Sequence, residues 1–347
     1  MFWLNSLVAL LLVISFLIPY LPPKSFPTLA IFSVLVSPLI VLNIIFAIYW
    51  LIRLRRQFLV STLVLVIAYF HFNPFFEFSS EGNESEYNSS LKILSYNVHL
   101  MNAYEENPTH DVQKIFSALL GDKQPEVVFI QEYYRDSKLK FPDYPYQFIH
   151  FKEFRNKNGD LKISVLGHAI LSKYPLLNTG AFDFPKTYNN TLYADVVKGK
   201  DTVRIYNLHL KSLGILPSVS SLQDGNKEKL LQRMSHAFVG QQEHLEEILK
   251  HKNTSPHPVI LGGDFNNTPF SYAYRMIDKE MKDAFVERGN GLGTTYLFDS
   301  YPMRIDYIFV SEGLDVLQFE TTTNTFSDHY PVSTTVGWSR ISEGKEN

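Results

Sequence analysis

Amides, acids and histidines stand together at the ends of apolar runs in this chain. The segment 259–268, VILGGDFNNT, predicts a buried strand that ends at a glycine pair and then presents Asp264 and Asn266 on one face. The segment 203–210, VRIYNLHL, likewise places Asn207 and His209 two residues apart. An amide and an imidazole on one face suit phosphate contact and proton transfer. Taken alone, the GGDFN motif could also be a turn, because Gly, Asp and Asn are common turn residues.

Two earlier segments carry residues of the same kinds. The segment 92–98, KILSYNV, leads to Asn97 and His99, and the segment 125–132, PEVVFIQE, is a nearly continuous apolar strand that ends in Glu132. The alternative for Glu132 is a solvated acid at a strand end. A helix is expected between these strands, at 111–120, and the order strand, helix, strand indicates α/β layering.

The last third of the chain adds a second histidine and two acids. Asp306 lies in RIDYIFV, and FSDHYPV carries Asp328 and His329 ahead of a proline. Neighbouring strand residues point to opposite faces, so Asp328 and His329 are expected to serve different parts of a site. An imidazole usually needs a carboxylate that fixes its tautomer, and Asp306 is the candidate partner of His329. His168 lies inside an apolar run and is expected to be a packed residue outside the site.

Three apolar runs dominate the first 76 residues. No charged residue lies in 3–21, 27–52 or 57–76. A helix needs about 20 residues to cross a bilayer, and each run has close to that length or more. We therefore expect a membrane anchor, 1–76, with three transmembrane helices. The alternative is a cleaved signal peptide followed by two buried core helices, but no basic region precedes Trp3.

The charges around these runs predict an orientation in the membrane. The second connection carries Arg53, Arg55 and Arg56, whereas the first carries only Lys24. Basic residues in short loops favour the cytoplasmic side. The chain after the third helix is therefore expected outside the cytoplasm, on the periplasmic side if the membrane is a bacterial inner membrane.

The remainder of the chain is expected to form one large domain. The segment 77–90 is polar, acidic and free of aliphatic residues, which predicts a flexible linker. The domain then covers 91–338 and is followed by a short tail, 339–347. The chain contains no cysteine, so it has neither disulfides nor a cysteine-based zinc site.

The ordered motifs SYNV, FIQE, YNLHL, GGDFN, RIDYIFV and SDHYPV resemble the endonuclease/exonuclease/phosphatase superfamily, which includes nucleases, neutral sphingomyelinase and inositol polyphosphate 5-phosphatase. The resemblance covers about 91–338, and the preceding apolar runs are similar to a membrane-anchored bacterial branch. It implies an α/β (α+β) fold, a four-layer sandwich of two packed mixed β-sheets flanked by helices, with the active site at one edge.

The resemblance also implies a metal site. Glu132 would be the principal ligand of a divalent cation, assisted by Asn97 and Asp328. Mg²⁺, or Mn²⁺ in its place, suits such oxygen ligands and would neutralise the charge of a phosphodiester. Several nucleases of the superfamily have Asp where this chain has His99, so the second metal site that this Asp supports is in doubt here. A zinc site is the weaker alternative because no HExxH helix is present.

The remaining residues of the motifs would act on water, phosphate and protons. By the resemblance, Asp264 and Asn266 would orient the attacking water and hold the scissile phosphate. His329, backed by Asp306, would be the general base or a phosphate-stabilising imidazole. The second histidine, His209, would protonate the leaving oxygen, and Asn207 beside it would contact the phosphate.

The substrate is less sharply indicated than the chemistry. We expect a phosphodiesterase or nuclease, although 91–338 carries 26 basic against 29 acidic residues and therefore no strong basic field for nucleic acid. Tyr188, Tyr193 and the loop 213–222 could form an apolar rim, which makes a phospholipid or sphingomyelin-type phosphodiesterase, or an inositol-phosphate phosphatase, the alternative. No obligate protein partner is indicated.

Two other classes of function agree less well with the sequence. A catalytically silent, membrane-anchored binding domain is disfavoured because both histidines and the acids of the motifs are intact. A transporter or channel would need polar groups inside the spans, where Asn43 is nearly alone.

Overall fold

The computed structural model describes residues 1–72, 76–104, 111–156, 158–215 and 226–340. The chain forms two compact units that interleave in the sequence. The helical unit comprises Met1–Phe75, Leu213–Glu246 and Asn267–Lys279, and the sheet unit comprises Phe76–Ser212, Glu247–Asn266 and Glu280–Asn347. The segments 213–246 and 267–279 therefore belong with the N-terminal helices. The sequence alone predicts both of them in the domain that begins at residue 91.

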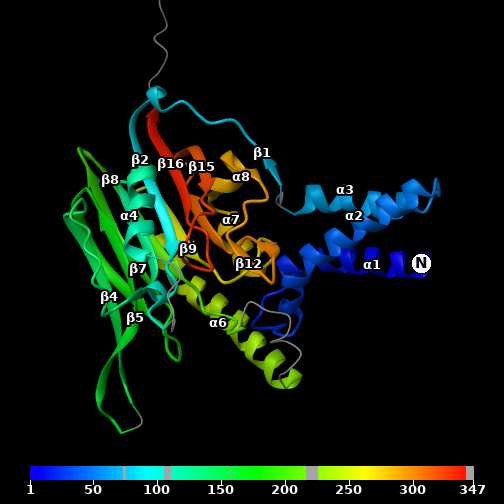
Figure 1. The fold of residues 1–347 in the computed structure, drawn as a ribbon, viewed down its shortest axis with the longest axis horizontal. Coiled ribbons are helices and arrows are strands. Elements are labelled where there is room, and N and C mark those ends of the chain that lie inside the picture. The colour runs from blue at the N-terminus through cyan, green and yellow to red at the C-terminus, as the bar shows by residue number, and fades with distance from the viewer. Residues whose placement is uncertain (73–75, 105–110, 157, 216–225, 341–347) are drawn as a thin grey trace, which may run out of the picture. The chain divides into compact units, whose positions relative to one another are not determined.

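The sheet unit contains two six-stranded sheets (Figure 1). One has the order β15 (Asp315–Thr321), β16 (Val332–Arg340), β2 (Tyr87–Asn97), β3 (Val127–Tyr134), β5 (Leu161–Ser172) and β4 (Tyr146–Arg155). The other has the order β10 (Lys282–Asp283), β14 (Asp306–Val310), β9 (Val259–Asp264), β8 (Asp201–His209), β7 (Asn190–Lys198) and β6 (Leu176–Asp183). Each sheet has one parallel pair, β2 with β3 and β8 with β9, and its other pairs are antiparallel, so both sheets are mixed.

Apolar side chains on alternate residues hold the layers together. Ile93 and Phe129 of one sheet share a buried cluster with Ile205 and Ile260 of the other. The opposite faces of β2 and β3 pack against helix α4 (Val112–Lys123), whose Phe116 is buried there. On the other sheet, the Tyr206 hydroxyl lies 2.8 Å from Nδ1 of His251 in the last turn of helix α6 (Lys227–Lys252). The expected fold of two packed mixed sheets flanked by helices is confirmed.

Short elements complete the sheet unit. They are β1 (Glu77–Phe78), η3 (Glu84–Glu86), η4 (His99–Asn102), α8 (Ala284–Arg288), β11 (Asn290–Gly291), β12 (Tyr296–Phe298) and β13 (Tyr301–Met303). The segment 77–90 differs from the flexible linker that its composition predicts. Its β1 pairs with β11, the Gly82 N–H donates to the Leu317 carbonyl at 2.7 Å, and β2 already begins at Tyr87. Polar side chains do not prevent this order, because the contacts use the backbone.

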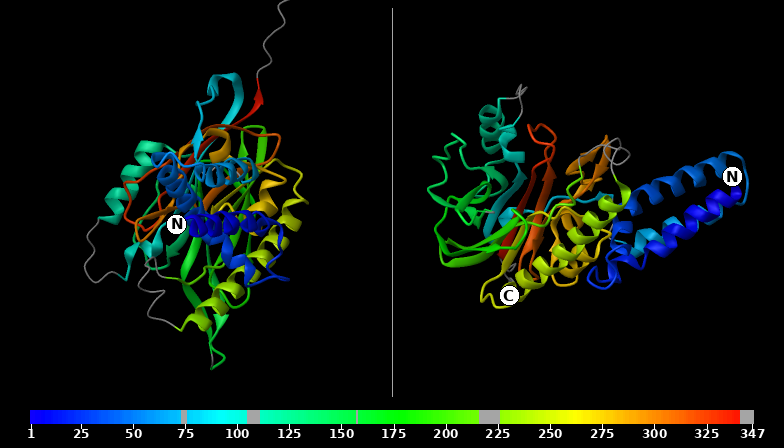
Figure 2. Two further views of the ribbon diagram at one scale, coloured as in Figure 1. Left: turned by 90° about the vertical axis from the view of Figure 1, so that its right-hand side faces the viewer. Right: turned by 90° about the horizontal axis from the view of Figure 1, so that it is seen from below.

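The helical unit begins with α1 (Phe2–Ser15), η1 (Ile18–Tyr20), η2 (Leu29–Leu35), α2 (Val36–Ile52) and α3 (Phe58–His71). The helices α1, α2 and α3 run side by side (Figure 2), and Ser61 Oγ of α3 donates to Asn5 Oδ1 of α1 at 2.7 Å. Large apolar side chains point outward, with Trp3 84% and Phe70 82% exposed. A surface of this kind suits lipid better than water.

Two of these apolar stretches are long enough to cross a membrane within the described residues, Phe2–Tyr20 and Leu29–Ile52. The third, α3, has 14 residues. A helix of that length extends about 21 Å, whereas the hydrocarbon core of a bilayer is about 30 Å thick. Residues 73–75 of the third predicted span lie outside the described part of the chain. The third span therefore stays a prediction.

Candidate active site

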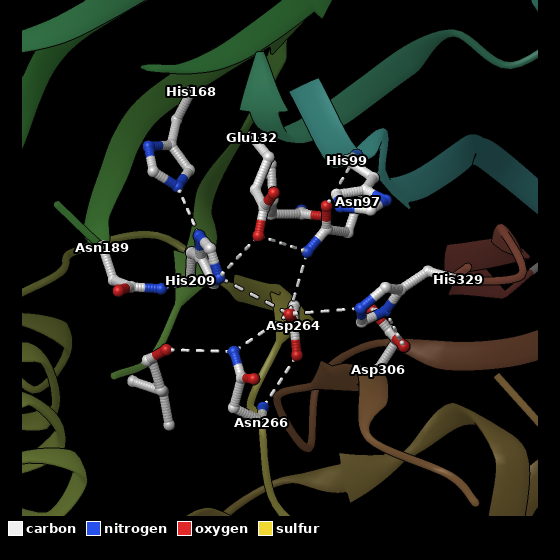
Figure 3. Close-up of polar contacts among 12 residues, drawn as sticks. Asn97, His99, Glu132, His168, Asn189, His209, Asp264, Asn266, Asp306 and His329 are labelled. Carbon is white, nitrogen blue, oxygen red and sulfur yellow. Dashed lines mark hydrogen bonds and ion pairs between the residues drawn. The ribbon is translucent and has the colours of Figure 1, made fainter. Parts of the chain in front are cut away.

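Four strand ends meet at one edge of the sandwich. In the parallel pair β8 and β9, His209 lies opposite Asp264, and in the antiparallel pair β14 and β9, Asp306 also lies opposite Asp264. The other sheet supplies Asn97 from the end of β2 and Glu132 from β3. Figure 3 shows these side chains pointing toward one another.

Asp264 is the centre of the arrangement. It is 1% exposed, and its Oδ2 accepts hydrogen bonds from Asn97 Nδ2 and Asn266 Nδ2, each at 3.0 Å. The same oxygen lies 3.5 Å from His209 Nε2 and 3.8 Å from His329 Nε2 (Figure 3). Its Oδ1 accepts from the Asn266 backbone N–H at 2.7 Å. One carboxylate thus lies beside both predicted histidines and two of the three predicted amides.

The glycine pair before Asp264 allows the close approach of β9 to β8. Gly263 has φ +137°, and a Cβ added there would lie 1.9 Å from the Leu208 carbonyl oxygen. No other residue type fits this position without moving one of the strands. Asn266, at φ +51°, then turns the chain back so that its side chain reaches Asp264 and the Leu210 carbonyl.

His329 and Asp306 form a buried pair. Nδ1 of His329 lies 3.0 and 3.2 Å from the two carboxylate oxygens of Asp306. Burial disfavours the imidazolium, but the negative charges of Asp306 and Asp264 outweigh burial and raise the pKa of His329 to about 10. Burial raises the pKa of Asp264 to about 7, against the opposing effect of His329. At neutral pH, His329 therefore carries a proton and Asp264 is poised to accept one.

Glu132 and Asn97 form the other side of the site. Glu132 has φ +55° at an irregularity in the pairing of β3 with β5, and its Oε1 accepts from Asn97 Nδ2 at 3.3 Å. Burial raises the pKa of Glu132. Asp328 is farther out, with its side chain 32% exposed and its Oδ1 3.4 Å from Nδ1 of His99. His99 thus faces the predicted ligand Asp328.

The donor set fits a hard divalent cation. Glu132 and Asp264 are two carboxylates with pKa values raised by burial, and both lie against the Asn97 amide. A cation would relieve that concentration of negative charge, and carboxylate oxygens are ligands that Mg²⁺ accepts. Asn97 faces both carboxylates with its Nδ2, while its Oδ1 accepts from the His99 N–H.

A second group could also hold a metal ion among the described residues. Asp264, Asp306 and His329 offer three donor atoms within 4.8 Å of one another. However, Nδ1 of His329 is engaged with Asp306, and an imidazolium has no lone pair for a metal. In that protonation state His329 is not a metal ligand.

Two neighbours of His209 were not expected from the sequence. His168 Nε2 lies 3.0 Å from His209 Nδ1, and Asn189 Nδ2 lies 2.6 Å from His209 Nε2 (Figure 3). An amide nitrogen only donates, so in this arrangement Nδ1 of His209 carries the hydrogen and His168 accepts it. Burial lowers the pKa of His168 to about 3, which keeps it neutral and able to accept. His168 and His209 are 41 residues apart on strands of different sheets, and no sequence spacing indicates their contact.

Asn207 has a position that does not suit its expected role. It is fully buried between the sheets, and its Nδ2 donates to the carbonyl oxygens of Ile130 and Ala169 at 3.0 and 2.9 Å. Its Oδ1 accepts from Gln131 Nε2 at 2.6 Å. With both amide hydrogens used, Asn207 joins the two sheets, and the geometry gives no support for phosphate contact.

The expected apolar rim is only partly described. Tyr188 is 51% exposed and packs edge-on against Phe154. Tyr193 instead lies with its ring centroid 4.4 Å from that of His251, against the end of α6. Residues 216–222 of the predicted rim loop, and 341–347 of the tail, lie outside the described residues.

A sandwich of two mixed sheets with acids, amides and two histidines at one edge defines a hydrolase fold of the phosphodiesterase and nuclease type. Residues 94–329 match the model of the Endonuclease/Exonuclease/phosphatase family, and the chain belongs to that family. Residues 1–75 match a domain of unknown function (DUF8431). No curated protein matches the chain.

Solved structures share the fold at low sequence identity. An endonuclease/exonuclease/phosphatase from Beutenbergia cavernae DSM 12333 is 19% identical, with a TM-score of 0.52 and 72% of each chain covered. D. rerio TDP2 complexed with single strand DNA product is 18% identical, with a TM-score of 0.51, 72% of this chain covered and 100% of that chain. A functionally unknown conserved protein from Enterococcus faecalis V583 is 21% identical, with a TM-score of 0.51 and the same coverage.

Proposed function

We propose that this chain is a membrane-anchored phosphoester hydrolase that depends on a divalent metal ion and acts on phosphodiesters. The observation that carries the proposal is the position of Asp264 Oδ2, which faces Asn97, Asn266, His209 and His329 at 3.0 to 3.8 Å. Asn97 and His209 come from different sheets, and Asn266 and His329 come from segments outside the strands, yet all four gather around one buried carboxylate, which stability alone does not require.

Glu132 is the proposed principal ligand, with Asn97 and Asp328 beside it. When bound, Mg²⁺ or Mn²⁺ would supply positive charge that makes the phosphorus easier to attack. Burial raises the pKa values of both Glu132 and Asp264, so a bound cation would offset the cost of holding their negative charges there.

Asp264 is the proposed general base. A pKa of about 7 suits a group that must take a proton from water near neutral pH, and Asn266 holds its carboxylate in place from both the backbone and the side chain. His329, protonated and fixed by Asp306, would stabilise the negative charge that grows on the phosphate oxygens. His209 would donate a proton to the leaving oxygen through Nε2 only after this nitrogen has gained a proton, because in the arrangement described above Nε2 accepts from Asn189.

A nuclease is the first candidate for the kind of phosphodiesterase. The structure of D. rerio TDP2 with single strand DNA product shows that the same fold accommodates nucleic acid in another protein. A lipid phosphodiesterase is the second candidate. It is favoured because Asn266 of the site and Asn267 of the helical unit are consecutive residues, which keeps the reaction close to the anchor along the chain.

Membrane attachment rests on the outward apolar surface of α1, α2 and α3. Arg53, Arg55 and Arg56 favour a cytoplasmic position for the loop just before α3. The side of the membrane on which the sheet unit lies therefore depends on whether α3 crosses the bilayer. We propose that α3 crosses, which places the site outside the cytoplasm. A reporter fused after Ser80 should then be active only outside, and activity in the cytoplasm would contradict this topology.

The test of function uses the full chain, purified in detergent or lipid nanodiscs, with Mg²⁺, Mn²⁺ or a chelator. Single-stranded DNA, duplex DNA, RNA, a phospholipid and a nitrophenyl phosphodiester are supplied as substrates. We expect metal-dependent hydrolysis of at least one phosphodiester, and its loss in Asp264→Asn. Binding without turnover on every substrate would instead favour the silent binding domain.

A further inference from the structure

The chain passes directly from the catalytic strand into the helical unit. Asp264 and Asn266 belong to the sheet unit, and the helical unit resumes at Asn267 and continues through α7 (Tyr272–Asp278). The connection after β8 also leads into the helical unit. His209 ends that strand, and the helical unit resumes at Leu213. Two strands that carry site residues are therefore followed, within a few residues, by segments that fold with the N-terminal helices.

A buried polar cluster holds the segment after Asn266. The Asn267 Nδ2 donates to Gln241 Oε1 of α6 at 2.7 Å, and Ser33 Oγ of η2 lies 3.4 Å from Asn267 Oδ1. The Thr268 hydroxyl donates to the Ser33 carbonyl at 3.0 Å, and the Thr268 N–H donates to Asn267 Oδ1 at 2.9 Å. All four side chains are at most 3% exposed. Polar groups buried this deeply are costly to leave unpaired, so the cluster fixes the backbone at 267 and 268.

Apolar and ionic contacts surround the cluster. Phe270 packs edge-on against Phe72, with 4.9 Å between ring centroids, and the Arg275 guanidinium lies 4.0 Å from the centroid of Tyr20. Leu213 packs with Ile31 of η2 and Phe238 of α6. Lys24 forms an ion pair with Glu246. The N-terminal segment therefore contacts both stretches that continue from the catalytic strands.

We propose that the N-terminal segment is part of the catalytic apparatus rather than a tether alone, and that Asn267 is a positioning residue. The η2 segment and α6 hold Asn267 and Thr268, and this fixes the backbone conformation of Asn266, the residue that holds the Asp264 carboxylate. Loosening the cluster would lower the rate of the chemical step without weakening substrate binding. The expected change in rate rests on the proposed function, whereas the expected change in backbone mobility does not.

The test compares two variants of the full chain in lipid nanodiscs. Asn267→Ala removes the contacts to Gln241 and Ser33. The matched control, Ser61→Ala, removes an equally buried hydrogen bond between α3 and α1 that leads to neither catalytic strand. Amide hydrogen exchange over 267–279 and steady-state kinetics on a nitrophenyl phosphodiester are measured for both and for the parent chain.

We expect Asn267→Ala to raise exchange over 267–279 about tenfold or more and to lower kcat by a similar factor, with KM nearly unchanged. Ser61→Ala should leave both measurements at parent values. If the Asn267→Ala protein cannot be produced in folded form, Gln241→Met removes the same hydrogen bond by replacing its acceptor. The same two measurements on that variant then test the proposal. Equal exchange in Asn267→Ala and the parent would overturn the proposal even if the chain had no phosphodiesterase activity. Faster exchange with unchanged kcat would overturn the positioning role, while a parent chain without turnover would count against the proposed function instead.

Discussion

Replacing His168 with Phe tests whether a residue that lies behind the site, against His209, contributes to the rate. The substitution removes the acceptor 3.0 Å from His209 Nδ1 and leaves a buried N–H without its partner. Such a loss costs about 1–3 kcal/mol, and if the whole cost falls on the transition state the rate drops about 5- to 150-fold. His168→Gln keeps a hydrogen-bond acceptor at the end of a side chain of similar length. Its rate should therefore fall much less than that of His168→Phe.

The assay is kcat/KM for a phosphodiester with a poor leaving group and for a nitrophenyl ester, each at saturating Mg²⁺. The defect of His168→Phe should be larger with the poor leaving group, because that group needs the proton from His209. Since the pKa of His168 is about 3, the defect should also be constant between pH 6 and 9. His251→Phe is the control, because it breaks a hydrogen bond to Tyr206 away from the site and should lower stability without a leaving-group effect. Equal defects on both substrates, or equal behaviour of the two Phe variants, would refute the reasoning.

Three other predictions concern metal, protons and acid stability. Glu132→Gln should weaken Mg²⁺ binding at least tenfold with the fold intact, and an unchanged metal titration by calorimetry would remove Glu132 from the ligand set. Asp306→Asn and His329→Ala should each cost a large part of kcat, and the double variant little more than either one, because the pair acts as a unit; additive losses in a double-mutant cycle would separate their roles. Burial alone would raise the pKa of Asp195, but the hydrogen bonds from Arg204 outweigh it and hold the pKa below its ordinary value. The stability that this acid contributes is therefore complete above about pH 4 and lost as the pH falls further, so thermal melts of Asp195→Asn should depend less on pH in that range than melts of the parent chain.

The sequence predicts the strands of the candidate site well because their signals are local. The apolar run that begins at Val259 predicts the start of β9, although the strand continues past the glycine pair to Asp264. The boundaries of β3 and β8 agree within about two residues, whereas β2 begins at Tyr87, inside the expected linker. Burial of a strand demands apolar residues in succession, and the polar group that follows marks its end. Their order along the chain is enough to indicate the family, and hence the two packed sheets.

The features that the sequence does not predict depend on contacts across the fold. Asn207 has the same local pattern as Asn97, yet the first joins two sheets and the second faces the site, a difference that only the partner sheet determines. His168 looks like a packed strand residue until β8 brings His209 against it. The membership of α7 in the helical unit likewise follows from buried contacts with residues more than 200 positions earlier.

The interleaving of the two units has a consequence for proteolysis. A cut between α3 and β1 would separate the N-terminal helices from the rest of the chain covalently, but α7 and the first part of α6 would still be packed against them. The sheet unit would remain attached to the proposed membrane anchor in a complex of two fragments, and a protease acting at that connection would not release it. Release of the sheet unit would require unfolding of these contacts, or further cuts on each side of both 213–246 and 267–279.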